Sequence, residues 1–226
     1  MNAESIDHGI PRARYCMKGT MTMKGTMTTD KSKNFPVVCV GGAEGDLGAY
    51  NELIRFLRPD MGVAVVIVNY LKGMGARLQE SLPLLTTMPV ELITEKLLIR
   101  PNRVFIIPEN RDLHVLNGEF RLKPTSKPLG WPDVITIFLR SITQNWDGQL
   151  IAVILSGYDG DGATALCAIK DVGGITIAQK AETASRPDMP LSAIASGCID
   201  FILAPEDIGK EIVRIAREQQ TKVSVR

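Results

Sequence analysis

From Phe35 onward, short runs that are apolar at every position alternate with segments of helical periodicity. Three of these runs are long and rich in β-branched residues: Val37–Val40, Ala64–Val68 and Leu150–Leu155. Strands without a polar face are buried on both sides, as in parallel sheets covered by helices. The alternation therefore predicts one α/β domain, with a doubly wound, mostly parallel sheet and helices on both faces.

Shorter apolar runs extend this pattern along the chain. Those predicted as strands are Val90–Ile93, Val104–Ile107, Ile175–Ala178 and Phe201–Leu203. Helical spacing predicts helices over Leu47–Leu57, through Leu78, Leu82 and Leu85, over Pro132–Thr143, Gly162–Val172 and Leu191–Ser196, and a terminal helix opened by Ala204-Pro205. Asn117-Gly118 separates two further apolar segments, which predicts an inserted β-hairpin with a two-residue turn.

The first 34 residues lack this periodicity. They are polar and contain an immediate repeat, Met17–Thr22 followed by Met23–Thr28. Such a segment cannot bury enough apolar surface to fold, so we expect a disordered tail over residues 1–34 and a folded domain over residues 35–226.

Charge and hydropathy exclude several classes of function. The net charge is +1 and no basic run stands out, so no nucleic-acid binding is predicted. No apolar run approaches the roughly 20 residues that span a bilayer, and no signal region is recognised, so we expect a cytoplasmic protein without membrane insertion. Cys39 and Cys167 have apolar neighbours and are predicted to be reduced core residues.

Two glycine-rich turns follow two of the long strands. One is Val40-Gly41-Gly42-Ala43-Glu44-Gly45-Asp46, and the other is Leu155-Ser156-Gly157-Tyr158-Asp159-Gly160-Asp161-Gly162. Open α/β sheets bind ligands outside the carboxyl ends of their strands, so we expect both turns to face one pocket.

The two turns bring together four carboxylates, from Glu44, Asp46, Asp159 and Asp161. Like charges at close range raise one another's pKa or recruit a cation, and oxygen ligands suit Mg²⁺ or Ca²⁺. A simpler interpretation is that Asp46 and Asp161 cap the helices that follow them while Glu44 points to water. We therefore predict no metal site and no cofactor.

The two turns and three later segments resemble the CheB-type chemotaxis receptor methylesterase family over nearly all of residues 35–217. Arg103–Leu113 resembles the family pattern G-x-x-Y-I-A-P-x-x-x-H-L. Ile177-Ala178-Gln179, Met189-Pro190 and Ala193 match T-I-A-Q … G-M-P-x-x-A, and Gly197–Leu203 resembles G-x-V-D-x-V-L. The resemblance implies the CheB methylesterase-like fold. It also implies hydrolysis of glutamate methyl esters on chemoreceptors, and in some members deamidation of receptor glutamines, by Ser, His and Asp.

Carried over position by position, the resemblance places the family serine at Ala43, the histidine at Tyr70 and the acid at Asp161. Alanine offers no nucleophile, and tyrosine, with an ordinary pKa of about 10, is a poor general base at neutral pH. The other residues expected to shape the pocket are Gly42, Glu44, Gly45, Asp46, Tyr158, Asp159 and Met189.

These replacements predict a methylesterase-like domain that is impaired or inactive and acts as a binding or regulatory pseudoenzyme in chemotaxis. The expected partner is a chemoreceptor or another signalling protein, with a methylated glutamate segment as one possible ligand. The 34 residues before the domain are too few for the phosphorylatable receiver domain of many family members, so none is expected. The alternatives are a working methylesterase or glutamine amidase with an atypical nucleophile, and a carboxylate-based metal enzyme.

Five other side chains bear on these alternatives. Ser156 and Ser185 are the candidate replacement nucleophiles, although neither has an evident base. His114 falls in the predicted hairpin, away from the turns. Trp131 and Trp146 flank a predicted helix and are interpreted as packing residues.

Overall fold

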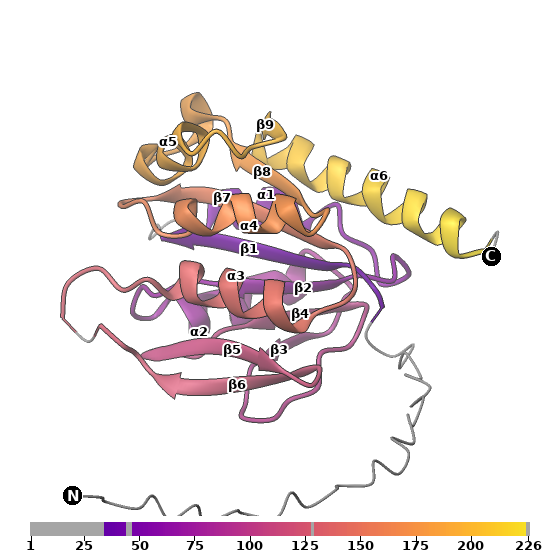
Figure 1. Ribbon diagram of the computed structural model, residues 1–226, viewed down its shortest axis with the longest axis horizontal. Helices are drawn as coiled ribbons and strands as arrows, with labels where there is room; N and C mark the ends of the chain where they lie inside the picture. The colour runs from indigo at the N-terminus through magenta and orange to yellow at the C-terminus, as the bar shows by residue number, and fades with distance from the viewer. Residues whose placement is uncertain (1–33, 44–46, 128, 225–226) are drawn as a thin grey trace, which may run out of the picture.

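The structure is a computed structural model that describes residues 34–43, 47–127 and 129–224. Within this part of the chain, seven strands form one sheet in the order β3-β4-β2-β1-β7-β8-β9 (Figure 1). Their bounds are β1 Val37–Ala43, β2 Ala64–Val68, β3 Val90–Leu92, β4 Arg103–Ile106, β7 Leu150–Gly157, β8 Ile175–Gln179 and β9 Phe201–Leu203. All neighbouring pairs are parallel, which confirms the predicted sheet.

The strand order reverses between β1 and β7. From β1 the chain crosses to β2 on one side, whereas from β7 it continues to β8 and β9 on the other. β1 and β7 run side by side from Val37 opposite Leu150 to Ala43 opposite Gly157. The carboxyl ends of these two strands therefore form the topological switch point at which such sheets bind ligands.

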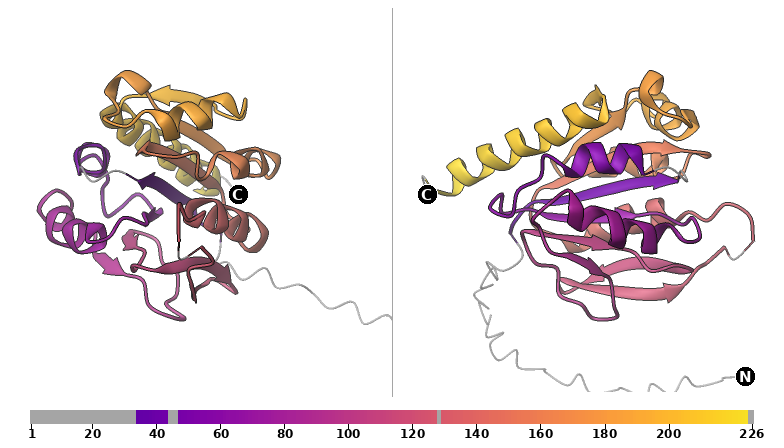
Figure 2. Two further views of the ribbon diagram at one scale, coloured as in Figure 1. Left: turned by 90° about the vertical axis from the view of Figure 1, so that its left-hand side faces the viewer. Right: turned by 180° about the vertical axis from the view of Figure 1, so that it is seen from behind.

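Helices cover both faces of the sheet, as predicted (Figure 2). Helices α1 (Gly48–Ile54), α2 (Met74–Ser81) and α6 (Pro205–Ser224) pack on one face. Helices α3 (Val134–Asn145), α4 (Leu166–Asp171) and α5 (Asp188–Ala195) lie on the other face, together with the hairpin β5 (Arg111–Leu116) and β6 (Glu119–Pro124). The short 3₁₀ helices are η2 Leu82–Leu84, η3 Ala163–Ala165 and η4 Ala181–Thr183.

The hairpin turn is formed by the dipeptide that predicted it. Asn117 and Gly118 have φ angles of 54° and 78°, as a type I′ turn requires at both central positions. The two strands pair antiparallel from Arg111 opposite Pro124 to Leu116 opposite Glu119.

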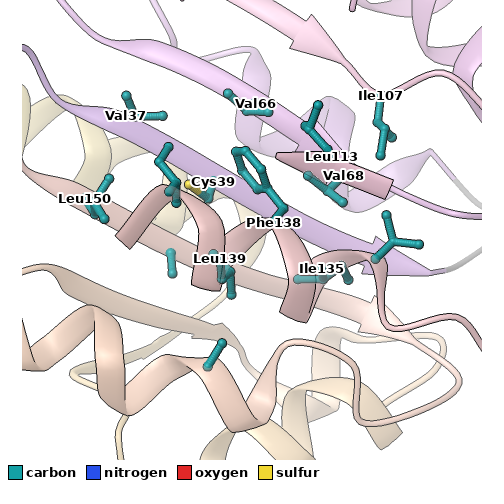
Figure 3. Close-up of a cluster of buried hydrophobic side chains, with 14 of the residues drawn as sticks. Val37, Cys39, Val66, Val68, Ile107, Leu113, Ile135, Phe138, Leu139 and Leu150 are labelled. Atoms are coloured by element: carbon teal, nitrogen blue, oxygen red, sulfur yellow. The ribbon is translucent and has the colours of Figure 1, made fainter. Parts of the chain in front are cut away.

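Helix α3 is pressed against the centre of the sheet. Its side chains Ile135, Phe138 and Leu139 are buried in the same core cluster as Cys39 and Val66 on the strands (Figure 3). Because α3 begins near the carboxyl ends of β1 and β7, its packing holds its N-terminus beside the predicted pocket.

Two predicted helices have different bounds for identifiable reasons. The helix expected over Gly162–Val172 is a 3₁₀ turn, Ala163–Ala165, followed by α4, and it starts after Gly162 because a φ of 92° lies outside the helical region. The helix expected from Leu191 begins earlier, at Asp188, since Pro190 falls in the first turn, where a missing N–H costs nothing.

The prediction for Cys167 is wrong. Cys167 is exposed on α4 and forms a disulfide with Cys198, in the segment after α5. Its apolar sequence neighbours Leu166 and Ile169 face the core, but helical geometry turns Cys167 away from them. Cys39 is free and fully buried, and burial raises the pKa of its thiol.

Candidate functional site

Ala43 lies at the end of β1, directly opposite Gly157 of β7, and its side chain has no exposed surface. A Cβ added at Gly157 would lie 3.0 Å from the Ala43 backbone nitrogen and 2.7 Å from Met189 Cε. A Cβ at Gly42 would collide with the Tyr50 hydroxyl. The glycines therefore let two strands and a buried methionine meet closely, and position 43 is enclosed by that packing.

Tyr70 follows β2, and its half-buried hydroxyl donates a 2.9 Å hydrogen bond to Asp159 Oδ2. Burial raises the pKa of Tyr70 most, and the hydrogen bond and negative charge of Asp159 raise it further. The phenol therefore stays protonated at neutral pH and cannot accept a proton from a nucleophile.

Asp161 is buried and holds the N-terminus of α3. Its Oδ2 accepts the Ile135 N–H at 2.8 Å, and its Oδ1 accepts the Thr136 N–H at 2.8 Å and the Thr136 hydroxyl at 2.7 Å. Helix N-termini present unpaired N–H groups that favour a carboxylate. Burial raises the pKa of Asp161, while these three hydrogen bonds oppose that rise.

The prediction that Asp161 caps the helix after Gly162 is therefore wrong, because its carboxylate caps α3 instead. The Gly162 N–H donates to Thr136 Oγ1 at 2.8 Å. A cap supplied from 25 residues away is invisible to a search for local capping patterns.

The carboxylate cluster is only partly within the described residues. Glu44, Gly45 and Asp46 lie outside them, so the predictions for these three positions are not addressed by the structure. In the part of the chain that is described, no group of three or more His, Cys, Asp or Glu side chains is arranged to hold a metal ion. Asp159 Oδ1 accepts the Asp161 N–H at 3.0 Å, so both aspartates already serve protein donors.

Ser156 is buried on β7, and its hydroxyl is hydrogen-bonded to the backbone of the loop before α5. Its Oγ accepts the Arg186 N–H at 2.9 Å and donates to the Arg186 carbonyl at 3.2 Å. Its own N–H donates to Gln179 Oε1 at 2.8 Å. The hydroxyl therefore fastens the loop before α5 to β7. Ser185, the other candidate nucleophile, is exposed on that loop.

His114 lies on β5 of the hairpin, as predicted. Burial lowers its pKa first, and the nearby Lys123 charge lowers it further, against an opposing effect of Asp112.

Trp131 packs against two tyrosines, as interpreted, but it does so at the surface rather than in the core. Trp131 precedes α3 in a loop and is 55% exposed, whereas Trp146 is 6% exposed and donates its Nε1–H to the Phe35 carbonyl at 3.0 Å. Trp131 stacks on Tyr158 with ring centroids 5.9 Å apart and meets the edge of Tyr70 at 6.1 Å. The signal that could have found it is the Gly130-Trp131-Pro132 sequence, which is typical of a loop rather than a helix.

The guanidinium of Arg186 lies 4.7 Å from the centre of the Tyr158 ring and completes this row of side chains. A cation over an aromatic face is attracted by the ring quadrupole. Tyr158 is 41% exposed, so the row forms an accessible surface beside the two turns.

Two cavities flank Trp131 and Lys127, and they divide the predicted site residues between them. One, of about 260 Å³, is lined by Tyr70 and the hairpin residue Arg111. The other, of about 440 Å³, is lined by Asp159 and Asp161. Ala43, Gly42 and Met189 are buried and line neither of these cavities. Within the described residues, Tyr70 and the aspartates of the turn after β7 therefore line different cavities, with Trp131 in the wall of both.

Comparisons with known proteins agree on one family. The family model described as "CheB methylesterase" matches residues 38–212. The crystal structure of the Thermotoga maritima CheB methylesterase catalytic domain superposes with a TM-score of 0.73 at 25% identity, covering 80% of this chain and 98% of that one.

Curated relatives carry the same description. A protein-glutamate methylesterase/protein-glutamine glutaminase of Rhizobium meliloti is 29% identical over 193 residues, covering 80% of this chain and 52% of its own length. A similarly named protein of Burkholderia lata is 31% identical over 185 residues, covering 80% of this chain and 54% of its own. The chain thus spans about half the length of these relatives. Among the described residues, no helix combines the length and apolar character needed to cross a membrane.

Proposed function

Because the chain belongs to the CheB methylesterase family, we propose that its protein-glutamate methylesterase-like domain has lost ester hydrolysis and serves as a binding or regulatory module. Its partner in this proposal is a chemoreceptor or another protein of chemotaxis signalling. The observation that carries the proposal is the enclosed alanine at position 43, where the family resemblance implies the nucleophilic serine.

The residue at the position implied for the base supports the same conclusion. A serine or other nucleophile needs a base within hydrogen-bond reach and a group that orients that base. Tyr70 occupies the position implied for the histidine, and its hydroxyl donates to Asp159 rather than accepting a proton.

The environment of Asp161 supports it as well. Both carboxylate oxygens accept hydrogen bonds from α3, so the retained acid has a structural task that explains its presence without catalysis. With nucleophile and base both replaced, a hydrolase of this kind loses about 10⁶-fold in kcat, so any residual methanol release is too slow to detect.

The test is methanol release from a glutamyl-methylated chemoreceptor, with the Thermotoga maritima CheB catalytic domain as the positive control. We expect no release above the rate without protein, with or without Mg²⁺. Capture of the same receptor on immobilised domain then tests the binding role. Absence of capture would overturn that role.

Three variants sharpen the result. Ala43→Ser alone should remain inactive, since position 43 is enclosed and Tyr70 is no base. Methanol release by the wild-type protein would overturn the proposal. If that release were lost in Ser185→Ala and kept in Ser192→Ala, the alternative of an atypical nucleophile would replace it.

A further inference from the structure

The cavity beside Tyr70 is cationic. Arg111 at the start of β5 and Lys127 in the loop after β6 both line it, and no carboxylate is among its lining residues. Lys127 is paired with Asp133, which lines the neighbouring cavity instead. Within the described residues, no carboxylate forms an ion pair with Arg111, which is exposed.

A polar group in the same wall also lacks a partner. Thr125 Oγ1 is buried and forms no hydrogen bond within the described part of the chain. Most buried polar atoms are paired, because leaving one unpaired costs about 1–3 kcal/mol.

Part of the remaining wall is apolar, while Asn69, Tyr70 and Asn110 line the cavity as well. The exposed indole of Trp131 forms one wall, and Leu71, Pro108 and Val134 contribute others. Methylene groups fit such walls, while a negative charge on the same ligand is met by Arg111, because Lys127 is already paired with Asp133. This pairing of apolar walls with convergent donors is typical of ligand sites, and it lies beyond the carboxyl ends of β2 and β4.

The neighbouring cavity has the opposite character. Asp159, Asp161 and Asp133 line it together with Lys127 and Arg140, so carboxylates outnumber cations there. An anionic ligand that reaches this surface is therefore drawn to the Arg111 side of Trp131 and repelled from the other.

We propose that the Arg111–Lys127 cavity binds the free side-chain carboxylate of a glutamate on an acidic protein segment and rejects its methyl ester and its amide. A carboxylate accepts charge-assisted, bidentate hydrogen bonds from a guanidinium, which neither an ester nor an amide does. The proposal rests on the function proposed above and makes it more specific. The domain would bind a receptor segment whose glutamate is demethylated, and it would not catalyse the demethylation itself.

Trp131 supplies the readout. The protein has two tryptophans, and only Trp131 lines the cavity, since Trp146 is buried elsewhere. Titration of intrinsic fluorescence with three synthetic helical peptides, identical except for glutamate, glutamate γ-methyl ester or glutamine, measures the preference directly. We expect the glutamate peptide to bind at least about tenfold more tightly than the other two, given the strength of hydrogen bonds to charged groups.

Arg111→Met is the decisive variant, because Arg111 is exposed and its replacement is expected to change stability little. It should weaken binding of the glutamate peptide about tenfold and leave the methyl ester peptide unchanged. Arg140→Met, which removes a cation from the other cavity, is the matched control and should leave the preference in place. Raising NaCl from about 0.05 to about 0.5 M should weaken binding of the glutamate peptide more than binding of the other two, because salt screens the attraction between its carboxylate and the cationic side chains.

Equal affinity for the three peptides, or unchanged affinity in Arg111→Met, would overturn this inference. Either result would leave the proposed loss of ester hydrolysis standing, because methanol release tests that separately. Conversely, methanol release by the wild-type protein would end the pseudoenzyme proposal, while the carboxylate preference would still be decided by the peptides.

Discussion

Tyr70 and Asp159 are joined by a 2.9 Å hydrogen bond that links the end of β2 to the turn after β7. The bond bridges the strand order across β1, which lies between β2 and β7. The residue at the position implied for the general base is thus held by a carboxylate two residues before the retained acid, Asp161, rather than by that acid. This hydrogen bond, called the Tyr70–Asp159 clasp below, joins the segments that follow the two strands on either side of β1.

The burial of Tyr70, together with its hydrogen bond to Asp159, makes the stability of the protein depend on pH. The pKa of Tyr70 is raised on folding, so the folded protein holds the phenolic proton more tightly than the unfolded chain. The stabilisation is complete below the ordinary tyrosine pKa of about 10 and is lost as the pH rises above it. We expect Tyr70→Phe to cost about 1 kcal/mol at neutral pH, and to cost progressively less above about pH 10.

Chemical unfolding of the wild type and Tyr70→Phe between neutral and alkaline pH measures this difference. Tyr158→Phe keeps the clasp and is the matched control, so its pH profile should follow that of the wild type. Parallel profiles for the wild type and Tyr70→Phe would contradict the role assigned to the clasp.

Asp161 should stabilise the fold through its hydrogen bonds to the N-terminus of α3, whether or not it has a catalytic role. Asp161→Ala leaves the buried N–H groups of Ile135 and Thr136 without their acceptor, so we expect a loss of about 2–4 kcal/mol in the free energy of unfolding. Asp159→Ala, which removes a less buried carboxylate, should cost about 1 kcal/mol. Thermal and chemical unfolding compare the two, and equal costs would argue against the cap.

Ser156 should behave as a tether rather than a nucleophile. Ser156→Ala removes both hydrogen bonds to the Arg186 backbone, and we expect it to lower the free energy of unfolding by about 1–2 kcal/mol. Hydrogen exchange should increase in the loop before α5. Ser185→Ala, on the same loop but exposed, should change neither measurement, and an equal effect of both variants would count against the tether.

The disulfide should contribute to stability only under oxidising conditions. Cys167 and Cys198 are 31 residues apart, and closing a loop of that size in the unfolded chain stabilises a protein by about 2–4 kcal/mol. Without reductant, Cys198→Ser should therefore unfold at a lower denaturant concentration and a lower temperature than the wild type. With excess dithiothreitol the two should become similar, and a persisting difference would show that the serine itself, rather than the lost bond, is responsible.

Local pattern was enough to determine the framework of this protein. Val37–Val40, Ala64–Val68 and Leu150–Leu155 are apolar throughout, and hydrophobic periodicity is set by neighbours in the chain, so their burial as parallel strands could be predicted. The turn at Asn117-Gly118 was predictable for the same reason, since a type I′ turn depends on the conformations of two adjacent residues.

The chemistry of the candidate site was decided by tertiary structure. Which carboxylate Tyr70 meets, which helix Asp161 caps and whether Trp131 is exposed all depend on contacts between segments far apart in the chain. The disulfide of Cys167 likewise depends on a partner 31 residues away. Sequence determined which residue types occupy the positions of interest, because composition and spacing are local. Only the packing of α3, the hairpin and the two turns decided what those side chains touch.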